Sequence, residues 1–413
     1  MFIRQSYQNI KSVMNDVFKL KRTDFLLVAF LTLMSGSPVL GNPKFMGAVG
    51  ICALLYSINR GDYVLRSSLW KYLLFFVIIY VGQYITLGTI SLLGSINVLG
   101  KIVFGATVMW YLKERFRGIY LYVMYFFSCI SLVCFLLEIA GIYIPDLFPT
   151  QPSRHSVLVY NSLIFDEHRN SGPFWEPGAF ACYLILVPLL YVDNLKDFVH
   201  SQRKEIFILF VALITTFSTT GYICLAVIVV YYLIVHAKNQ YYAYFIYLPL
   251  LLFSMYVIYD NLPFLGEKIE TQVDKTTEME GNFSNTRMGS LEFDKHYIKK
   301  HPFCGNGLIE KTRYADHKEL WGLHLGHGNG FSNFIAQMGI PAMFMYLLMV
   351  YKVFFKKYIV LLVVVLLLQG EQLLNYPLFL SLPFVILSVN NNSKTKNILY
   401  RNYETNCNYY NGI

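Results

Sequence analysis

The stretch 120–144, YLYVMYFFSCISLVCFLLEIAGIYI, carries one charged side chain, Glu138, in an otherwise uncharged run. A transmembrane helix needs roughly 20 consecutive, mostly apolar residues, and this run is long enough. Similar runs occur as FLLVAFLTLM (25–34), YLLFFVIIYV (72–81) and YIVLLVVVLLL (358–368). The whole chain is 55% hydrophobic and 14% charged, whereas a soluble domain carries about 25% charged residues. The sequence therefore predicts an all-α polytopic membrane protein.

The apolar runs predict about twelve transmembrane helices. Eight spans stand apart in the sequence, at 25–41, 44–58, 69–91, 97–112, 118–144, 178–192, 241–259 and 331–351. Two further apolar regions, 206–237 and 358–390, are each too long for one helix, and STTGY (218–222) and QGEQ (369–372) supply a turn within them. We therefore expect each of these two regions to cross the membrane twice.

The lysines and arginines predict the orientation of the chain, because cytoplasmic loops are enriched in both residues. If the N-terminus is cytoplasmic and both long regions cross twice, the basic clusters all fall on the inside. The chain then divides into a cytoplasmic N-terminus (1–23), a transmembrane bundle (24–390) and a cytoplasmic tail (391–413). Two loops, 145–177 and 260–329, are expected to be periplasmic. The second lies between the ninth and tenth spans and is predicted to be partly helical.

Charge and cysteine usage exclude other classes. The net charge of +9 is spread over short loops rather than gathered on one soluble face, so we expect no nucleic-acid partner. The seven cysteines show no spacing that implies a disulfide framework. Seven of the nine histidines lie in the two outer loops, so we expect any chemistry on the outer face.

RNSGPFWEPGAF (169–180) places polar groups immediately before an apolar span. Gly172 and Pro173 predict a turn, and Pro177 suits a first helical turn. Arg169 is then a candidate anion-binding residue, since its planar guanidinium matches phosphate, with Trp175 and Glu176 beside it. The alternative is an arginine that reaches the membrane interface next to an ordinary helix start, with Trp175 as an interfacial anchor.

NTRMGSLEFDKHYIKKHPFCGNGL (285–308) predicts a helix on the outer face. Its apolar residues recur at near-helical spacing, Asn285 or Thr286 can cap it, and His301-Pro302 ends it. Arg287 should therefore lie in the first turn, as a second candidate for anion binding. The alternative is a solvated arginine on an amphipathic helix.

GHGNGFSNFIAQMGI (326–340) places His327 just before a span. Asn329, Asn333 and Gln337 follow at a spacing of four residues, which aligns them on one helix face. Polar groups in a membrane helix are costly when they face lipid and normally face the bundle interior or a wet cavity. We therefore expect this face to line a cavity, although His327 alone is compatible with an interfacial histidine.

These three stretches together resemble the O-antigen polymerase and O-antigen ligase superfamily of bacterial envelope enzymes. The matching positions are Arg169/Gly172/Pro177, Arg287, His301-Pro302/Gly305/Gly307, and His327 with Asn329. Two positions depart from the pattern: Gly328 intervenes between His327 and Asn329, and STTGY lacks an arginine that many relatives carry there.

The resemblance implies glycan transfer at the outer face of the bacterial inner membrane, with both termini cytoplasmic. An oligosaccharide on undecaprenyl diphosphate serves as donor and, in a polymerase, another serves as acceptor. His327, Arg169 and Arg287 would be catalytic, and Glu176, Trp175, Asn329, Asn333 and His301 would bind substrate. No cofactor and no metal are implied, and the lipid bilayer and a chain-length regulator protein are the further partners to consider.

Other functions remain open at the level of sequence. Within the superfamily the rival is an O-antigen ligase, which would transfer the glycan to lipid A core. In a different class, the rival is a flippase for lipid-linked oligosaccharides, although the chain shows none of the internal repeats common in transporters. A metal-dependent mechanism would draw on the short acidic cluster Asp166, Glu167 and His168. Glu371 lies at the outer end of a span, with no role predicted.

Overall fold

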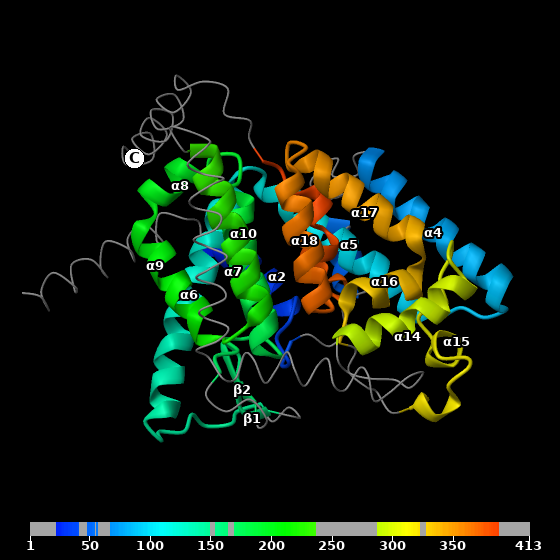
Figure 1. Ribbon diagram of the computed structural model, residues 1–413, viewed down its shortest axis with the longest axis horizontal. Helices are drawn as coiled ribbons and strands as arrows, with labels where there is room; N and C mark the ends of the chain where they lie inside the picture. Colours follow the sequence, from blue (N-terminus) through cyan, green and yellow to red (C-terminus); the bar gives the residue numbers. More distant parts are fainter. Residues whose placement is uncertain are drawn as a thin grey trace, which may run out of the picture.

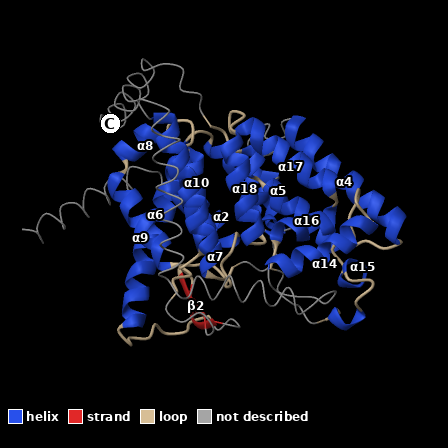
Figure 2. Ribbon diagram, viewed as in Figure 1, coloured by secondary structure: helices blue, strands red, loops and turns tan. Residues whose placement is uncertain are grey.

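Helices dominate the computed structural model, and strands are confined to one short hairpin among the described residues (Figures 1 and 2). The structure describes residues 22–40, 48–53, 55–56, 67–148, 153–163, 169–236, 287–322 and 328–387. The predicted span at 241–259 lies outside these ranges, as do residues 260–286 of the larger predicted loop.

The first half of the chain supplies a bundle around one central helix. Its elements are α2 (Arg22–Met34), α4 (Ser67–Leu87), α5 (Leu92–Leu112), α6 (Arg115–Ile139), β1 (Ser153–Val157), β2 (Tyr160–Leu163), α7 (Pro177–Leu190), α8 (Leu195–Ser201), α9 (Arg203–Thr215) and α10 (Thr219–His236). Every residue of α7 except Pro188 is buried, and α6, α9, α10 and α18 pack around it. The uniformly apolar sequence of α7 agrees with this position, because a helix that is hydrophobic on all sides is a buried one.

The second half adds a group of shorter helices. Its elements are α14 (Arg287–Lys300), α15 (Glu310–Arg313), η2 (Lys318–Leu320), α16 (Gly330–Met338), α17 (Ile340–Val353), α18 (Tyr358–Gly370), η3 (Leu373–Asn375), α19 (Pro377–Leu380) and η4 (Leu382–Phe384). The helix predicted from the sequence around Arg287 is confirmed as α14, with Arg287 in its first turn and its end just before His301.

Four helices among the described residues are long and apolar enough to cross a membrane: α4, α5, α6 and α10. A fifth crossing results if α7 and α8, which meet at 110°, are taken as one bent span. The described part of the region 206–237 forms two helices, as the sequence predicts, but they are separated by residues 216–218, and most of the predicted turn STTGY (218–222) lies in the first turn of α10. The apolar helices indicate a membrane protein, and the predicted total of about twelve spans exceeds the number seen in the described part.

Two predicted spans have a different form in the structure. The span at 331–351 is divided at Gly339 into α16 and α17; Gly339 has φ +87, and a Cβ there would lie 2.1 Å from the carbonyl oxygen of Phe303. Residues 373–387 form short turns rather than a second long helix after α18, because Pro377 and Pro383 begin successive short segments.

A β-hairpin lies in the predicted loop 145–177 and was not expected from the sequence. Tyr160 and Ser162 on β2 both donate hydrogen bonds to the carboxylate of Glu138, the single charged residue of the opening stretch. The backbone N–H of Asn161 donates to the carbonyl of Gly172 (2.7 Å). The hairpin thus connects the end of α6 to the loop that carries Arg169.

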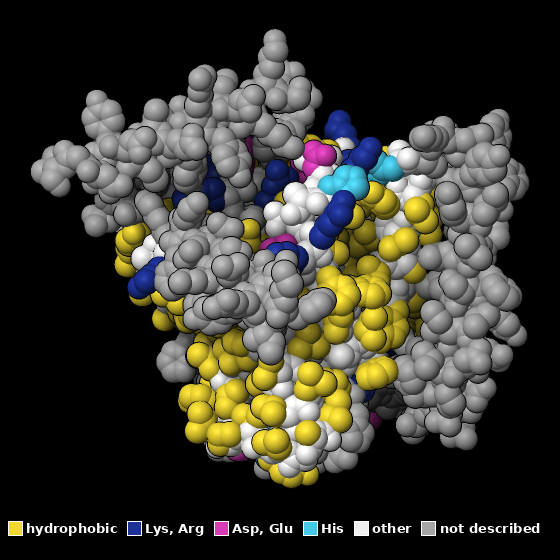
Figure 3. Space-filling model, turned by 90° about the vertical axis from the view of Figure 1, so that its left-hand side faces the viewer, with side chains coloured by type: hydrophobic (Ala, Val, Ile, Leu, Met, Phe, Trp, Pro, Cys, Tyr) yellow, Lys and Arg dark blue, Asp and Glu magenta, His cyan; other side chains and the backbone are white. Residues whose placement is uncertain are grey.

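Two opposite edges of the molecule differ in their elements. The hairpin and α14, both predicted to lie outside, are along the lower edge in Figure 1, and α8, predicted to lie inside, is at the upper edge. Figure 3 shows one side face, on which apolar side chains cover the middle and lower parts while Lys, Arg and His gather toward the top. This division is typical of a protein with a broad lipid-facing surface.

Candidate active site

The side chain of Arg169, in the loop before α7, contacts the residues that follow the end of α9. Its Nε donates to the carbonyl of Thr216 (3.1 Å) and its Nη2 donates to the carbonyl of Phe217 (3.2 Å). Unpaired carbonyls at the C-terminus of a helix carry partial negative charge and favour a nearby cation. The local turn chemistry of the α9–α10 connection therefore fixes the guanidinium of Arg169.

Asn170 anchors the loop that carries Arg169. Its backbone N–H donates to the carbonyl of Thr215 (2.9 Å), and its side-chain amide donates to the hydroxyls of Thr215 (3.0 Å) and Ser131 (3.2 Å). Its side-chain oxygen accepts from the N–H of Gly172 (2.9 Å), which has φ +54, a conformation that glycine adopts readily. The turn predicted from Gly172 and Pro173 is confirmed, and it presents Arg169 to α9.

Arg287 approaches the same connection from α14. Its Nη1 lies 3.4 Å from the hydroxyl of Thr219, the first residue of α10. Arg169 contacts residues 216 and 217, so the two arginines contact neighbouring residues of the same short connection. The structure brings together these two predicted site residues from distant parts of the chain, at the N-terminus of an 18-residue helix. A helix N-terminus adds partial positive charge to that of the guanidinium groups.

Glu176 and Trp175 lie at the start of α7, beside the arginines. The indole N–H of Trp175 donates to Oε1 of Glu176 (2.9 Å), and its ring stacks on Tyr376 with the centroids 4.6 Å apart. The backbone N–H of Trp175 donates to the carbonyl of Gly36 at the end of α2 (3.0 Å). Trp175 is therefore packed between three segments and orients the Glu176 carboxyl.

Glu371 completes the cluster and was not assigned a role from the sequence. It lies in the turn after α18, is 7% exposed, and hydrogen-bonds the side chain of Glu176. Burial, and then the negative charge of Glu176, raise the pKa of Glu371 well above its usual range, while the charges of Arg287 and Arg169 oppose that rise. The raised pKa favours the protonated form of Glu371 beside Glu176 and the two arginines.

Three glycines permit this close assembly. A Cβ at Gly178 would lie 2.1 Å from Oε1 of Glu371, and a Cβ at Gly330 would lie 2.1 Å from its backbone oxygen. A Cβ at Gly370 would lie 2.8 Å from the side chain of Thr220. The elements α7, α10, α16 and α18 therefore meet closely around the carboxyl pair. One signal in the sequence identifies Glu371: it is the only charged residue between Lys357 and Lys394, and such residues in membrane proteins are usually functional.

Asn329 and Asn333, whose helix face was predicted to line a cavity, are buried and make structural contacts. Asn329 caps α16 by accepting from the N–H of Ser332 (3.0 Å). Asn333 accepts from Arg313 (3.2 Å) and donates to Gln372 (3.2 Å). Their contacts with the loop containing Glu371 and with α14 tie α16 to the cluster.

Arg313 and Asp294 form a buried ion pair. Their side chains are 2% and 0% exposed, and Asp294 also accepts from the hydroxyl of Ser332. The guanidinium of Arg313 lies against the rings of Tyr297 and Tyr314. This pair holds α14, which begins with Arg287, against α16.

The structure does not bring His301 to the arginines. His301 follows the last residue of α14 and Arg287 is the first, so they are separated by about 20 Å along the helix at 1.5 Å per residue. The turn after His301 packs elsewhere: the Gln83 side chain donates to the carbonyls of Cys304 (2.6 Å) and Gln337 (2.9 Å). Burial and Lys300 lower the pKa of His301, which favours its neutral form.

His327 lies outside the described residues, as does the acidic cluster Asp166, Glu167 and His168. The described residues that follow His327 contact the first turn of α14. The N–H of Gly328 donates to the hydroxyl of Ser290 (3.0 Å), and the side chain of Asn329 lies 3.5 Å from the backbone oxygen of Arg287. The chain immediately after His327 is thus held beside Arg287.

Comparison with known proteins supports the family resemblance. Residues 206–347 match the family model described as O-antigen ligase. This range contains Arg287, His301 and His327, whereas Arg169, Glu176 and Glu371 lie outside it. No curated protein matches the chain, and no solved structure matches it either. The match confirms the resemblance to the O-antigen ligase and polymerase superfamily, whose members are glycosyltransferase-like enzymes.

Proposed function

We propose that this protein is an O-antigen polymerase, a membrane glycosyltransferase that joins undecaprenyl-diphosphate-linked oligosaccharide repeat units on the periplasmic face of the inner membrane. The observation that carries the proposal is the convergence of Arg169 and Arg287 on the turn before α10. Two guanidinium groups at a helix N-terminus suit a diphosphate. In apolar surroundings such an anion needs nearby positive groups to neutralise its charge.

In this reaction an acceptor hydroxyl oxygen attacks the anomeric carbon of the donor glycan. The bond from that carbon to the diphosphate oxygen breaks, and the lipid diphosphate leaves with the electron pair. Arg169 and Arg287 bind the diphosphate and stabilise its increasing negative charge. His327 accepts the hydroxyl proton, a role for which a histidine of ordinary pKa is well suited near neutral pH.

The carboxyl pair has a separate part in this proposal. Because the raised pKa favours protonated Glu371, the pair places less negative charge beside the arginines than two carboxylates would. The remaining positive charge is available for the diphosphate. We place two groups of this cluster next to the bound donor: Glu176 and Trp175, at the half-buried start of α7. Further candidates for substrate contact are Asn329, Asn333 and His301.

The decisive test uses purified protein in lipid nanodiscs with undecaprenyl-diphosphate-linked repeat units as both donor and acceptor. We expect longer lipid-linked glycans and release of undecaprenyl diphosphate, with or without a chelator. Recovery of unreacted donor under conditions that preserve folding would contradict the proposal. A loss of activity on chelation that a divalent ion restores would instead favour a metal mechanism involving Asp166, Glu167 and His168.

O-antigen ligase activity is the second candidate, because the matching family model carries that description. In a deletion strain, loss of a polymerase should leave lipid A core with a single repeat unit. Loss of a ligase should leave core with no repeat unit at all. The same purified protein can be supplied with lipid A core as acceptor, and transfer to core in preference to a second repeat unit would identify the ligase.

A further inference from the structure

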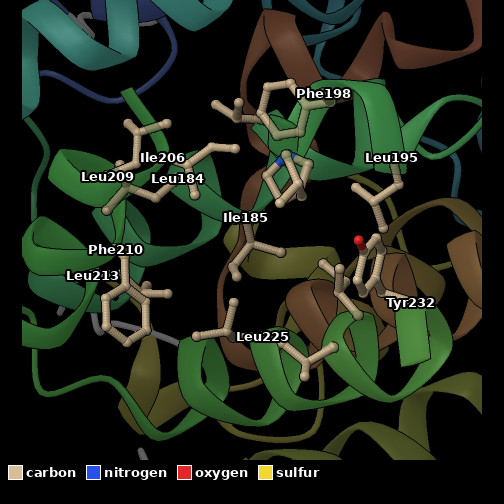
Figure 4. Close-up of a pocket in the computed structure, with 15 residues that line it drawn as sticks. Leu184, Ile185, Leu195, Phe198, Ile206, Leu209, Phe210, Leu213, Leu225 and Tyr232 are labelled. Atoms are coloured by element: carbon tan, nitrogen blue, oxygen red, sulfur yellow. The ribbon is translucent and has the colours of Figure 1, made fainter. Parts of the chain in front are cut away.

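An apolar cavity of about 270 Å³ lies between α7, α8, α9 and α10 (Figure 4). Its wall includes residues from all four helices: Leu184, Leu195, Ile206, Leu213, Leu225 and Tyr232. The hydroxyl of Tyr232 is the only polar side-chain group among the residues that line it. A cavity of this composition suits a hydrocarbon, because water would find too few hydrogen-bonding partners there.

The cavity opens on a surface that is itself apolar. Two lining residues, Phe210 on α9 and Val229 on α10, are 44% and 38% exposed. Their neighbours on the same helices, Phe207 and Ile223, are exposed as well. A hydrocarbon chain in the surrounding bilayer can therefore enter between α9 and α10.

Three of the four helices connect this cavity to the candidate active site. Thr219 begins α10 beside Arg287, and Leu225 and Tyr232 follow at about 9 and 20 Å along the helix axis. On α9, Leu213 lies less than one turn before Thr216, whose carbonyl binds Arg169. On α7, Leu184 lies about two turns after Glu176. The polar site and the cavity thus lie at successive depths along the same helices.

We propose that this cavity binds the isoprenoid tail of the lipid diphosphate whose head group binds Arg169 and Arg287. The inference rests on the proposed function, which supplies a diphosphate at that position. A cavity of about 150 Å³ accommodates benzene, so one of 270 Å³ accommodates about ten carbons, or about two isoprene units. The cavity therefore recognises a segment near the head group rather than the whole tail.

The cavity selects by shape. A lipid tail gains little hydrophobic free energy when it moves from the bilayer into an apolar protein cavity, since both environments are apolar. Close van der Waals contact is what remains, and a methyl-branched chain fills a wide cavity with more contacts than a straight chain does. We therefore expect the protein to distinguish prenyl diphosphates from straight-chain alkyl diphosphates.

The experiment compares binding of undecaprenyl, geranyl and straight-chain alkyl diphosphates to the full chain in nanodiscs. Undecaprenyl and geranyl diphosphates should each bind at least about tenfold more tightly than the straight-chain alkyl diphosphates, a difference of about 1.4 kcal/mol. Leu225→Trp, which fills the cavity, should remove most of this difference and leave the binding of straight-chain alkyl diphosphates unchanged. Val229→Trp at the opening is the second variant, since a half-exposed position tolerates a larger side chain. Ile223→Trp on the exposed face of the same helix is the control.

The outcomes separate the two proposals. Unchanged undecaprenyl binding in both folded cavity variants would overturn the tail site and assign the cavity to bilayer lipid. Equal affinity for geranyl diphosphate and a ten-carbon straight-chain alkyl diphosphate in the wild-type protein would overturn it as well. If the tail dependence is present but no glycan is transferred to any acceptor, the tail site stands and the proposed function fails.

Discussion

The side chains of Glu371 and Glu176 are hydrogen-bonded to each other, which joins the turn after α18 to the start of α7. Gly178 makes the contact possible, because any Cβ there would lie 2.1 Å from Oε1 of Glu371. Two ionised carboxylates could not share this buried position beside each other. The neutral form of Glu371 is therefore the form on which the geometry of the site depends.

Replacing Glu371 by glutamine should preserve folding and most of the activity, because glutamine keeps a neutral donor and acceptor of nearly the same shape. Replacing it by leucine should lower the unfolding free energy by about 1.5–3 kcal/mol, the contribution of a hydrogen bond to a charged group. Thermal unfolding and the polymerisation assay measure the two effects. The control is Glu292→Gln on the exposed face of α14. A Glu371→Gln protein as defective as Glu371→Leu would show that ionised Glu371 is required.

The raised pKa of Glu371 predicts a pH dependence of stability. The folded protein holds this proton at pH values where the unfolded chain has released it, so folding is favoured by the bound proton. Stability from this group should be fully present below about pH 4.5, the ordinary pKa of Glu. It should decline as pH rises toward the folded-state pKa. The thermal midpoint of the wild-type protein should therefore fall with rising pH more steeply than that of Glu371→Gln, and identical profiles would refute the raised pKa of Glu371.

Arg287→Ala and Arg169→Ala should both abolish polymer formation but should differ in stability. Loss of one preorganised group that stabilises developing charge costs on the order of 10²–10³-fold in rate. Arg169 also binds two backbone carbonyls, so its removal should additionally destabilise the protein by about 1–3 kcal/mol. Lysine should restore little activity at either position, because it lacks the planar fork.

Arg203→Ala is the matched control for both arginine variants. Arg203 is exposed and begins α9 at the end of the helix away from the site. Its removal should leave polymer length and thermal stability unchanged. Full activity of Arg169→Ala at normal expression would return Arg169 to the interfacial role that the sequence also allowed.

The sequence predicted the helical class, the helix that begins with Arg287 and the turn that presents Arg169. These features follow from local rules: long apolar runs, near-helical spacing before His301-Pro302, and glycine and proline at 172 and 173. The convergence of Arg169 and Arg287 could be suspected only through the family resemblance. Their shared position at the turn before α10 depends on contacts between segments far apart in the chain.

The partner of Glu371 could not be predicted from the sequence. A lone carboxylate in an apolar region signals a special environment, but the identity of its partner depends on how α7 and α18 approach at Gly178. The β-hairpin was missed for a similar reason, since Glu138 stabilises β2 from the end of another element. The break at Gly339 was missed because the apolar sequence continues across residue 339, whereas the helix is interrupted there.

His327→Ala should reduce the rate of polymerisation by about 10²–10⁴-fold, the usual cost of losing a general base. Lipid-linked single repeat units should accumulate, and binding of undecaprenyl diphosphate should persist, because the arginines remain. The control is His200→Ala on α8, which lies at the opposite edge of the molecule from α14 (Figure 1). Turnover at the wild-type rate in His327→Ala protein would remove this histidine from the reaction.

The ion pair between Arg313 and Asp294 should stabilise the position of α14, and with it that of Arg287. Removing one partner leaves an uncompensated buried charge, so Arg313→Ala should cost about 3–5 kcal/mol. The double variant Arg313→Met, Asp294→Leu removes both charges and should be more stable than either single variant. If α14 stays in place in this double variant, Arg287 should bind diphosphate with near wild-type affinity.

The exposed pair of Lys300 and Asp316 provides the control, since Asp316→Ala should cost no more than about 1 kcal/mol. Additive losses in the double variant would show that the two side chains contribute independently, and that packing of α14 on α16 positions Arg287 without them.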